Sequence, residues 1–172
     1  MKIFLIGFMG SGKTTIGRRL AQMTGFDFVD TDLFIETQQG MTVAEIFASQ
    51  GESAFRELER NILIDLLKRD YSVVSTGGGM PCHGDNMELM LAGGKVVYLK
   101  TSPHALSRRL IRPHSVRPLI KGKTETELQQ YIINKLDERE PVYNRAHIVV
   151  QTENFSMEKL LQSLNLAKSS SC

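Results

Sequence analysis

Short apolar runs alternate along this chain with longer segments in which apolar residues recur every three or four positions. A short apolar run is typical of a strand buried on both faces of a sheet, and the longer spacing is typical of an amphipathic helix. The runs predict strands at 3–6, 28–29, 71–74, 96–99 and 148–150. The spacing predicts helices at 14–23, from about 33 onward, and at 42–51, 52–68, 86–91, 103–111, 124–139 and 157–166. Because strands and helices alternate, we expect an α/β fold, with a parallel sheet between two layers of helices.

Local signals set several of these boundaries. Gly25 follows the first helix and Gly51 separates two helical segments, as glycines at helix ends do. Thr42 and Glu45 have the spacing of a capping box, which predicts a helix start. Ligands on parallel sheets bind beyond the carboxyl ends of the strands, so the residues that directly follow each strand are the first candidates for a functional site.

The composition is that of an ordinary globular chain. It has 172 residues, of which 41% are hydrophobic and 23% are charged, and this length predicts one domain over 1–172. The formal net charge is +2, so the chain is no strong polyelectrolyte and we expect no nucleic-acid partner.

No stretch of the chain is apolar over the roughly 18 residues that a membrane-spanning helix needs. The apolar run at 3–6 is shorter than the core of a signal peptide, which has about 7–15 apolar residues. We therefore expect a soluble, cytoplasmic protein that binds no membrane.

The two cysteines, Cys82 and Cys172, are far apart in the sequence and form no CxxC pair. They predict neither a disulfide framework nor a structural zinc site. Cys82 is next to His83, but neighbours in sequence do not make a catalytic dyad in space, so we expect no nucleophile there.

The residues at 7–14, GFMGSGKT, match the pattern GxxxxGK[ST] and stand between a predicted strand and a predicted helix. The glycines allow a tight turn that points backbone N–H groups at phosphate oxygens, and the helix N-terminus adds positive potential. We expect Lys13 to reach the β- and γ-phosphates and the hydroxyl of Thr14 to hold Mg²⁺. The alternative, a glycine-rich turn with an exposed lysine, explains the placement less well. The motif does not say whether the phosphoryl group goes to water or to a second substrate.

Two aspartates, Asp30 and Asp32, follow the second predicted strand. They can divide two tasks, with Asp30 supporting the metal and Asp32 orienting an acceptor hydroxyl and taking its proton. The alternative is that one of them caps the helix that begins near 33.

Arg56 and Glu59 are three positions apart on a predicted helix. This spacing fits a solvated ion pair, and it equally fits a guanidinium that Glu59 holds toward a substrate carboxylate. The glycines at 77–79 follow a predicted strand and allow the backbone to approach a ligand closely, or they form a plain flexible turn. The residues alone leave both alternatives open.

The segment at 112–123 is polar and contains prolines, and arginines at 108, 109, 112 and 117 fall within ten residues in and just before it. Such a segment suits a lid that closes over phosphates and excludes water. A solvated basic loop is the alternative. RNA binding is a weaker one, because no aromatic residue stands among the arginines.

Together these motifs resemble the shikimate kinase family. The matching stretches are GFMGSGKTT at 7–15, DTD at 30–32, FRELE at 55–59, STGGG at 75–79, RPLI at 117–120 and REPVY at 139–143. The first of them is shared by many nucleotide-binding proteins, whereas the combination of the others is far more specific. The resemblance implies transfer of the γ-phosphate of ATP to the 3-hydroxyl of shikimate, in the pathway to aromatic amino acids.

The resemblance also implies the architecture. It implies a three-layer P-loop fold with a five-stranded parallel sheet in the order 2-3-1-4-5. A substrate-binding region lies at about 31–60 and a lid at about 112–123 in such a fold, and the protein is a monomer.

The resemblance further implies roles for individual residues. ATP is bound by Gly10, Ser11, Gly12, Lys13, Thr14, Thr15, Arg109 and Arg117. Mg²⁺ is bound by Thr14 and, through water, by Asp30. Shikimate is bound by Asp32, Arg56, Gly77, Gly78, Gly79 and Arg139, with the two arginines on its carboxylate. The catalytic residues are Lys13, Asp32 and Arg117.

One stretch departs from the family. Many members have a proline shortly after the last strand, near the adenine, whereas 150–155 reads VQTENF here, so the adenine wall must be built otherwise. Two alternatives remain for the function. One is another small-molecule kinase of this fold, acting on gluconate or a nucleoside monophosphate, and the less favoured one is a nucleotide-dependent switch. ATP consumption that depends on an acceptor separates a kinase from a switch.

Overall fold

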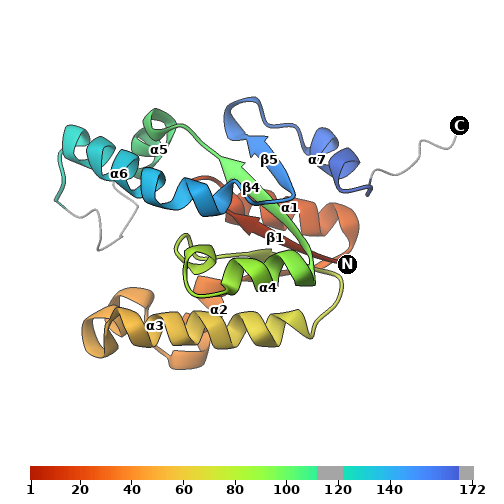
Figure 1. The fold of residues 1–172 in the computed structure, drawn as a ribbon, viewed down its shortest axis with the longest axis horizontal. Coiled ribbons are helices and arrows are strands. Elements are labelled where there is room, and N and C mark those ends of the chain that lie inside the picture. The colour runs from red at the N-terminus through yellow and green to blue at the C-terminus, as the bar shows by residue number, and fades with distance from the viewer. Residues whose placement is uncertain (112–121, 167–172) are drawn as a thin grey trace, which may run out of the picture.

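A computed structural model describes residues 1–111 and 122–166. Within these residues the strands form one parallel sheet in the order β2-β3-β1-β4-β5 (Figure 1). The strands are β1 at Lys2–Ile6, β2 at Asp27–Asp30, β3 at Ser72–Ser75, β4 at Lys95–Lys100 and β5 at Ile148–Gln151. The predicted α/β class and strand order are thereby confirmed.

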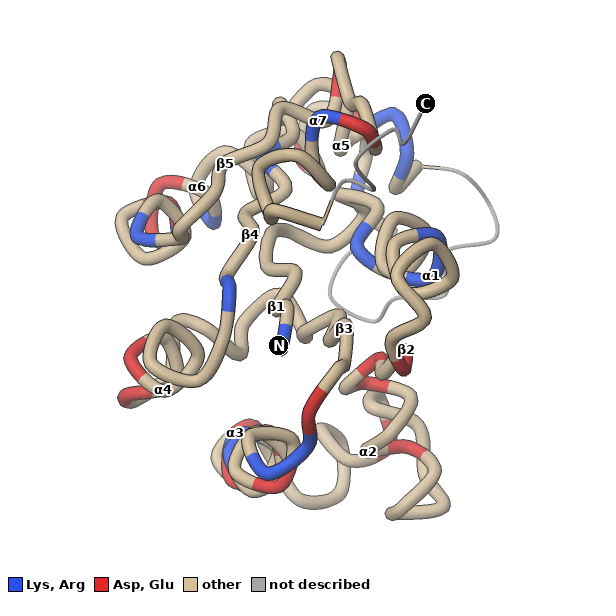
Figure 2. The backbone as a smooth tube through the Cα atoms, turned by 90° about the vertical axis from the view of Figure 1, so that its right-hand side faces the viewer, with Lys and Arg blue, Asp and Glu red and all other residues tan. Residues whose placement is uncertain are grey.

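Helices cover both faces of the sheet. The α-helices are α1 at Lys13–Thr24, α2 at Thr31–Gln39, α3 at Val43–Leu67, α4 at Asn86–Gly93, α5 at Pro103–Leu110, α6 at Glu125–Tyr143 and α7 at Met157–Ser163. The described part of the chain also contains the short 3₁₀ helices η1 at Met80–Cys82 and η3 at Thr152–Asn154. Helices α1 and α7 lie on one face of the sheet, and α3, α4 and α6 lie on the other (Figures 1 and 2).

The central strand β1 shows why the predicted strands lack polar alternation. Successive side chains of a strand point to opposite faces of the sheet. Ile3 and Leu5 belong to the apolar cluster under α1 and α7, and Phe4 and Ile6 belong to the cluster under α3, α4 and α6. All four are fully buried, because helices cover both faces.

Three predicted boundaries were wrong. Tyr71 does not begin β3, because its φ of 52° is left-handed and its side chain is exposed. Helix α6 does not end at Arg139 but continues through Pro141 to Tyr143, whose buried ring anchors the last turn. Helix α7 ends before 166, since Asn165 takes a left-handed φ of 56°.

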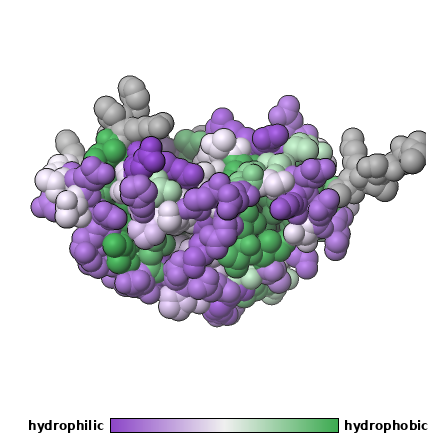
Figure 3. All heavy atoms as spheres, turned by 90° about the horizontal axis from the view of Figure 1, so that it is seen from above, coloured by the Kyte–Doolittle hydropathy of each residue, from purple (hydrophilic) through white to green (hydrophobic). Residues whose placement is uncertain are grey.

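No helix within the described residues is both long and apolar enough to cross a membrane. Hydrophilic side chains cover much of the face seen from above, with apolar side chains grouped between them (Figure 3). Val149 on the edge strand β5 is among the exposed apolar residues.

Candidate active site

The candidate residues gather at one edge of the sheet. Strands β2, β3 and β1 are neighbours and parallel, so their carboxyl ends meet at this edge. The segment at 7–12 follows β1, the turn into α2 follows β2, and the glycines at 77–79 follow β3. Motifs that are far apart in the sequence therefore become neighbours in space.

The loop at 7–12 connects β1 to α1 through a backbone that glycine makes possible. Gly7, Gly10 and Gly12 have φ values of 141°, 80° and 96°. A Cβ atom on Gly7 would lie 2.8 Å from the carbonyl oxygen of Leu99, which is too close for any other residue. Ser11 is buried in this loop, and Thr15 is exposed in the first turn of α1.

Two cationic side chains donate hydrogen bonds to backbone carbonyl oxygens of this loop. The Nζ atom of buried Lys13 donates to the carbonyl oxygens of Gly7, at 2.8 Å, and Phe8, at 2.9 Å. Arg109 on α5 donates from Nη1 to the carbonyl oxygen of Gly10 at 3.1 Å. Two cationic side chains, one from α1 and one from α5, thus border the loop.

The carboxylate of Asp30 faces the start of α1. The hydroxyl of Thr14 donates to Oδ2 of Asp30 at 2.8 Å. Asp30 occupies the position before α2, but its side chain makes no capping hydrogen bond, so the helix-capping alternative is wrong for this residue. Asp32 lies in the first turn of α2.

The glycines at 77–79 pack directly against four charged side chains. A Cβ atom on Gly77 would lie 2.6 Å from Oε1 of Glu59 and 2.8 Å from Oδ1 of Asp32. A Cβ on Gly79 would lie 2.7 Å from Nη1 of Arg56. Substituting either glycine would therefore push a charged group out of place, so packing within the protein already requires glycine at both positions.

Gly78, the middle glycine, lies between these charged side chains and the loop after β1. A Cβ on Gly78 would lie 3.4 Å from the carbonyl oxygen of Gly7 and 3.5 Å from Nη1 of Arg139. The Gly77 N–H donates to the hydroxyl of Thr31 at 2.9 Å, which ties the glycine segment to the start of α2.

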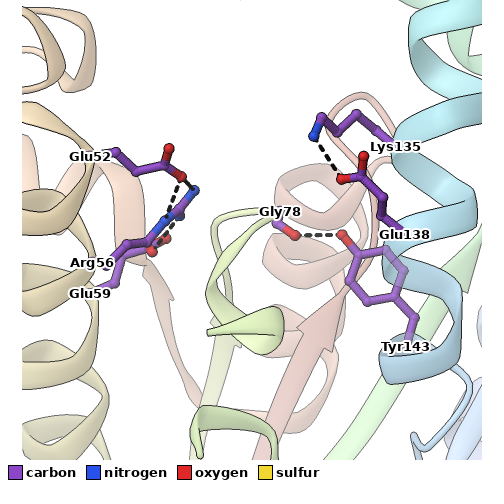
Figure 4. Close-up of polar contacts among 7 residues, drawn as sticks. All are labelled: Glu52, Arg56, Glu59, Gly78, Lys135, Glu138 and Tyr143. Atoms are coloured by element: carbon purple, nitrogen blue, oxygen red, sulfur yellow. Dashed lines mark hydrogen bonds and ion pairs between the residues drawn. The ribbon is translucent and has the colours of Figure 1, made fainter. Parts of the chain in front are cut away.

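Arg56 and Glu59 form a partly buried ion pair, so the solvated-pair alternative is wrong. Nη1 of Arg56 donates to Oε2 of Glu59 at 2.6 Å, and the Glu59 side chain is only 1% exposed (Figure 4). Burial raises the pKa of Glu59 to about 7, Arg56 opposes this rise, and the nearby Asp32 adds to it.

This raised pKa predicts how the stability of the protein depends on pH. Between the ordinary value of 4.5 and about 7, folded Glu59 keeps a proton that the unfolded chain has released. The folded state binds more protons there, so the contribution of Glu59 to the free energy of unfolding falls as pH rises across this window. Glu59→Gln stays neutral and should remove this slope. Denaturant unfolding of both proteins from pH 4.5 to 7.5 measures it.

Glu57→Gln is the matched control, since Glu57 is exposed on the same helix. Its unfolding free energy should run parallel to that of the natural protein throughout. If the Glu59→Gln curve were also parallel, Glu59 would be ionised across the window, contrary to the raised pKa.

The structure adds Tyr143 and Glu140, which the sequence analysis did not assign. Buried Tyr143 donates a short hydrogen bond from its hydroxyl to the carbonyl oxygen of Gly78 (Figure 4). Glu140 accepts from the hydroxyl of Tyr98 at 3.1 Å and pairs with Lys100. The four-residue step from Arg139 to Tyr143 was a usable signal, because residues so spaced share a helix face.

The turn after β5 takes the place where family members often have a proline. Thr152 begins η3, and its hydroxyl lies 2.7 Å from that of Thr101. Glu153 accepts from the backbone N–H of Ser102 at 2.8 Å. This turn is thus fixed to the end of β4 by side-chain hydrogen bonds.

Cys82 and His83 lie near the charged side chains of Arg56 and Arg139, whose charges act on both groups. Burial raises the pKa of the Cys82 thiol, which disfavours the thiolate. Burial and then the charge of Arg56 lower the pKa of His83. Arg117 and the 112–121 part of the expected lid lie outside the described residues, as does Cys172.

Comparisons with known proteins agree with this geometry. The family model described as shikimate kinase matches residues 9–166. A shikimate kinase of Parabacteroides distasonis is 42% identical over 166 residues, which cover 96% of each chain.

Solved structures give the same result. The shikimate kinase of Bacteroides thetaiotaomicron is 40% identical, with a TM-score of 0.92 and coverage of 96% of this chain and 99% of that one. The Acinetobacter baumannii enzyme, in complex with shikimate, is 36% identical, with a TM-score of 0.85 and coverage of 95% and 90%. A Sinorhizobium meliloti gluconokinase, at 17% identity and a TM-score of 0.55, shares the fold alone. The chain therefore belongs to the shikimate kinase family of ATP-dependent kinases.

Proposed function

We propose that this protein transfers the γ-phosphoryl group of ATP to the 3-hydroxyl of shikimate and releases ADP and 3-phosphoshikimate. The observation that carries the proposal is the contact between Gly78 and the loop after β1. It places the charged side chains around the glycines, which are Asp32, Glu59, Arg56 and Arg139, directly beside a phosphate-binding motif. These charged side chains belong to the specific motifs of the family. Transfer needs acceptor and phosphate within bonding reach, and this adjacency supplies it.

On the nucleotide side, the backbone N–H groups of Gly10, Ser11 and Gly12 bind the phosphates, with Thr15 at the helix start. Lys13 places its charge on the transferred phosphoryl group, and Arg109 binds ATP from its place beside the phosphate-binding loop. Arg117 is the second catalytic cation.

The residues Thr14 and Asp30 suit Mg²⁺. A hydroxyl and a carboxylate 2.8 Å apart offer the hard oxygen ligands that this ion prefers. Thr14 would bind the ion directly and Asp30 through water, and phosphate oxygens and waters would complete the ligands. When bound, Mg²⁺ neutralises charge on the phosphate oxygens.

On the acceptor side, Arg56 and Arg139 bind the carboxylate of shikimate. Asp32 accepts a hydrogen bond from the ring hydroxyl and takes its proton while the oxygen bonds to the γ-phosphorus and the bond to ADP breaks. The N–H groups of Gly78 and Gly79 would donate to the same ligand. Because Gly77 donates its own N–H to Thr31, it contributes mainly the space for Asp32 and Glu59.

The test is ADP release from Mg·ATP by the purified protein, with and without shikimate. We expect a rise of several orders of magnitude with shikimate, and none with quinate, gluconate or nucleoside monophosphates. If gluconate or a nucleoside monophosphate raised ADP release equally, shikimate would not be the specific acceptor. ATP binding with no acceptor response would favour the nucleotide-dependent switch.

Replacing Arg139 by alanine should raise KM for shikimate about ten- to a hundred-fold and change KM for ATP little, because a charge-assisted contact to the carboxylate is lost. Initial rates over a range of each substrate measure this. Arg145→Ala is the control, since Arg145 lies beyond the C-terminal end of α6 and pairs on the surface with Glu88. If KM rose for ATP alone, Arg139 would bind the nucleotide and not shikimate.

One kinase domain over 1–172, a monomeric state, a cytoplasmic location and the absence of a nucleic-acid partner stay predictions from the sequence.

A further inference from the structure

The guanidinium of Arg56 is paired with two carboxylates rather than one. Besides Glu59, it contacts Glu52, whose Oε1 accepts from Nε at 3.2 Å and from Nη2 at 2.8 Å (Figure 4). A guanidinium offers two neighbouring N–H groups along this edge, and this is a geometry in which it binds a carboxylate with two parallel hydrogen bonds. Glu52 thus holds an edge of Arg56 that suits a carboxylated ligand.

Other parts of the guanidinium also contact the protein. Nη1 donates to the buried Oε2 of Glu59 at 2.6 Å. The end of the group lies against Gly79, since a Cβ there would be 2.7 Å from Nη1 and 2.8 Å from Nη2. A ligand carboxylate that pairs with the Nε–Nη2 edge of Arg56 therefore meets Glu52 first.

The two carboxylates differ in how firmly they are held. The side chain of Glu59 is 1% exposed, whereas that of Glu52 is 60% exposed. Glu52 also follows a break in α3, because Gly51 has the non-helical angles φ 83° and ψ 173°. An exposed ion pair at a helix break is weak and can be exchanged, whereas breaking a buried one leaves a charge without compensation.

We propose that Glu52 is a positioning residue that competes with the acceptor carboxylate for Arg56. This inference rests on the proposed function, in which Arg56 binds the carboxylate of shikimate. Binding exchanges one carboxylate for another on the same edge of the guanidinium, so Arg56 keeps its charge compensated before and after. A neutral acceptor cannot displace Glu52, and the exchange thereby favours carboxylated acceptors.

The test compares Glu52→Gln with Glu57→Gln, which removes one negative charge from the exposed face of the same helix. Kinetics are measured with shikimate and with its neutral carboxamide, and binding of both is measured by calorimetry. Glu52→Gln should lower KM and Kd for shikimate about two- to five-fold, the range expected for losing an exposed ion pair as competitor. Kd for the carboxamide and KM for ATP should move by less, and Glu57→Gln should reproduce none of the gain.

Three results would overturn the inference. A raised KM for shikimate in Glu52→Gln would make Glu52 a support for Arg56, like Glu59. An unchanged KM would show no competition, and an equal gain for the carboxamide would show that the ligand carboxylate is not involved. Failure of the proposed function is a separate result, because the natural protein would then show no turnover of shikimate at all.

Discussion

Lys13→Ala is expected to lower kcat with saturating ATP and shikimate by about a thousand-fold. Phosphoryl transfer is accelerated mainly by positioning and by fixed positive charge, and losing a single fixed donor to the transition state costs about a hundred- to a thousand-fold in other enzymes. Lys13 makes a second contribution here, because its ammonium joins the carbonyl oxygens of Gly7 and Phe8 across the loop. Steady-state ADP release measures the loss.

The control for this variant is Lys68→Ala, which removes a lysine whose side chain is exposed and paired with Asp65 on the surface. It should keep the natural rate. Thermal unfolding of Lys13→Ala with and without ATP separates loss of chemistry from loss of fold. A kcat near that of the natural protein would refute the assignment of Lys13 to the transferred phosphate.

Asp32→Asn is expected to lower kcat about a hundred- to ten-thousand-fold, the usual range for removing a general base. An amide can still hydrogen-bond the acceptor hydroxyl but cannot take its proton. The substitution also removes one of the causes that raise the pKa of Glu59, so Glu59 should ionise at lower pH in this variant. Rates at saturating substrate and pH-dependent unfolding report the two effects separately.

Asp27→Asn provides the comparison, because Asp27 is exposed at the other end of β2. Its kcat should match that of the natural protein. If Asp32→Asn were equally active, the proton would have to leave by another group, or the reaction would need no base in the transition state.

The strands and the phosphate motif were predictable because their signals are local. Ile3–Ile6 reads as a fully buried strand because helices cover both of its faces, and this needs no knowledge of partners. The capping box at Thr42 and Glu45 formed as predicted, with the Glu45 N–H donating to the Thr42 hydroxyl at 3.2 Å. Interactions within one turn of chain are fixed by spacing alone.

The boundaries and alternatives that failed depend on distant parts of the chain. The turn at Pro141 stays helical because Tyr143 is buried and bonded to Gly78, a contact that spans 65 positions in sequence. Spacing left Arg56 and Glu59 open between a solvated ion pair and a guanidinium that Glu59 holds toward a substrate carboxylate. The decision came from burial, which isolates Glu59 from water beside Asp32 and Gly77.

The sequence by itself therefore determined the α/β class, the nucleotide-binding loop and, through its specific motifs, the family. It could do so because periodicity, turn chemistry and short motifs depend on residues that are close together in the sequence. Only the tertiary structure decided which polar and charged groups meet: Asp30 with Thr14, Asp32 and Glu59 around Gly77, and Arg56 between two carboxylates. The first two sets of contacts join segments that follow separate strands. For Arg56, whose two partners lie on its own helix, burial rather than spacing distinguishes the buried pair with Glu59 from the exposed pair with Glu52.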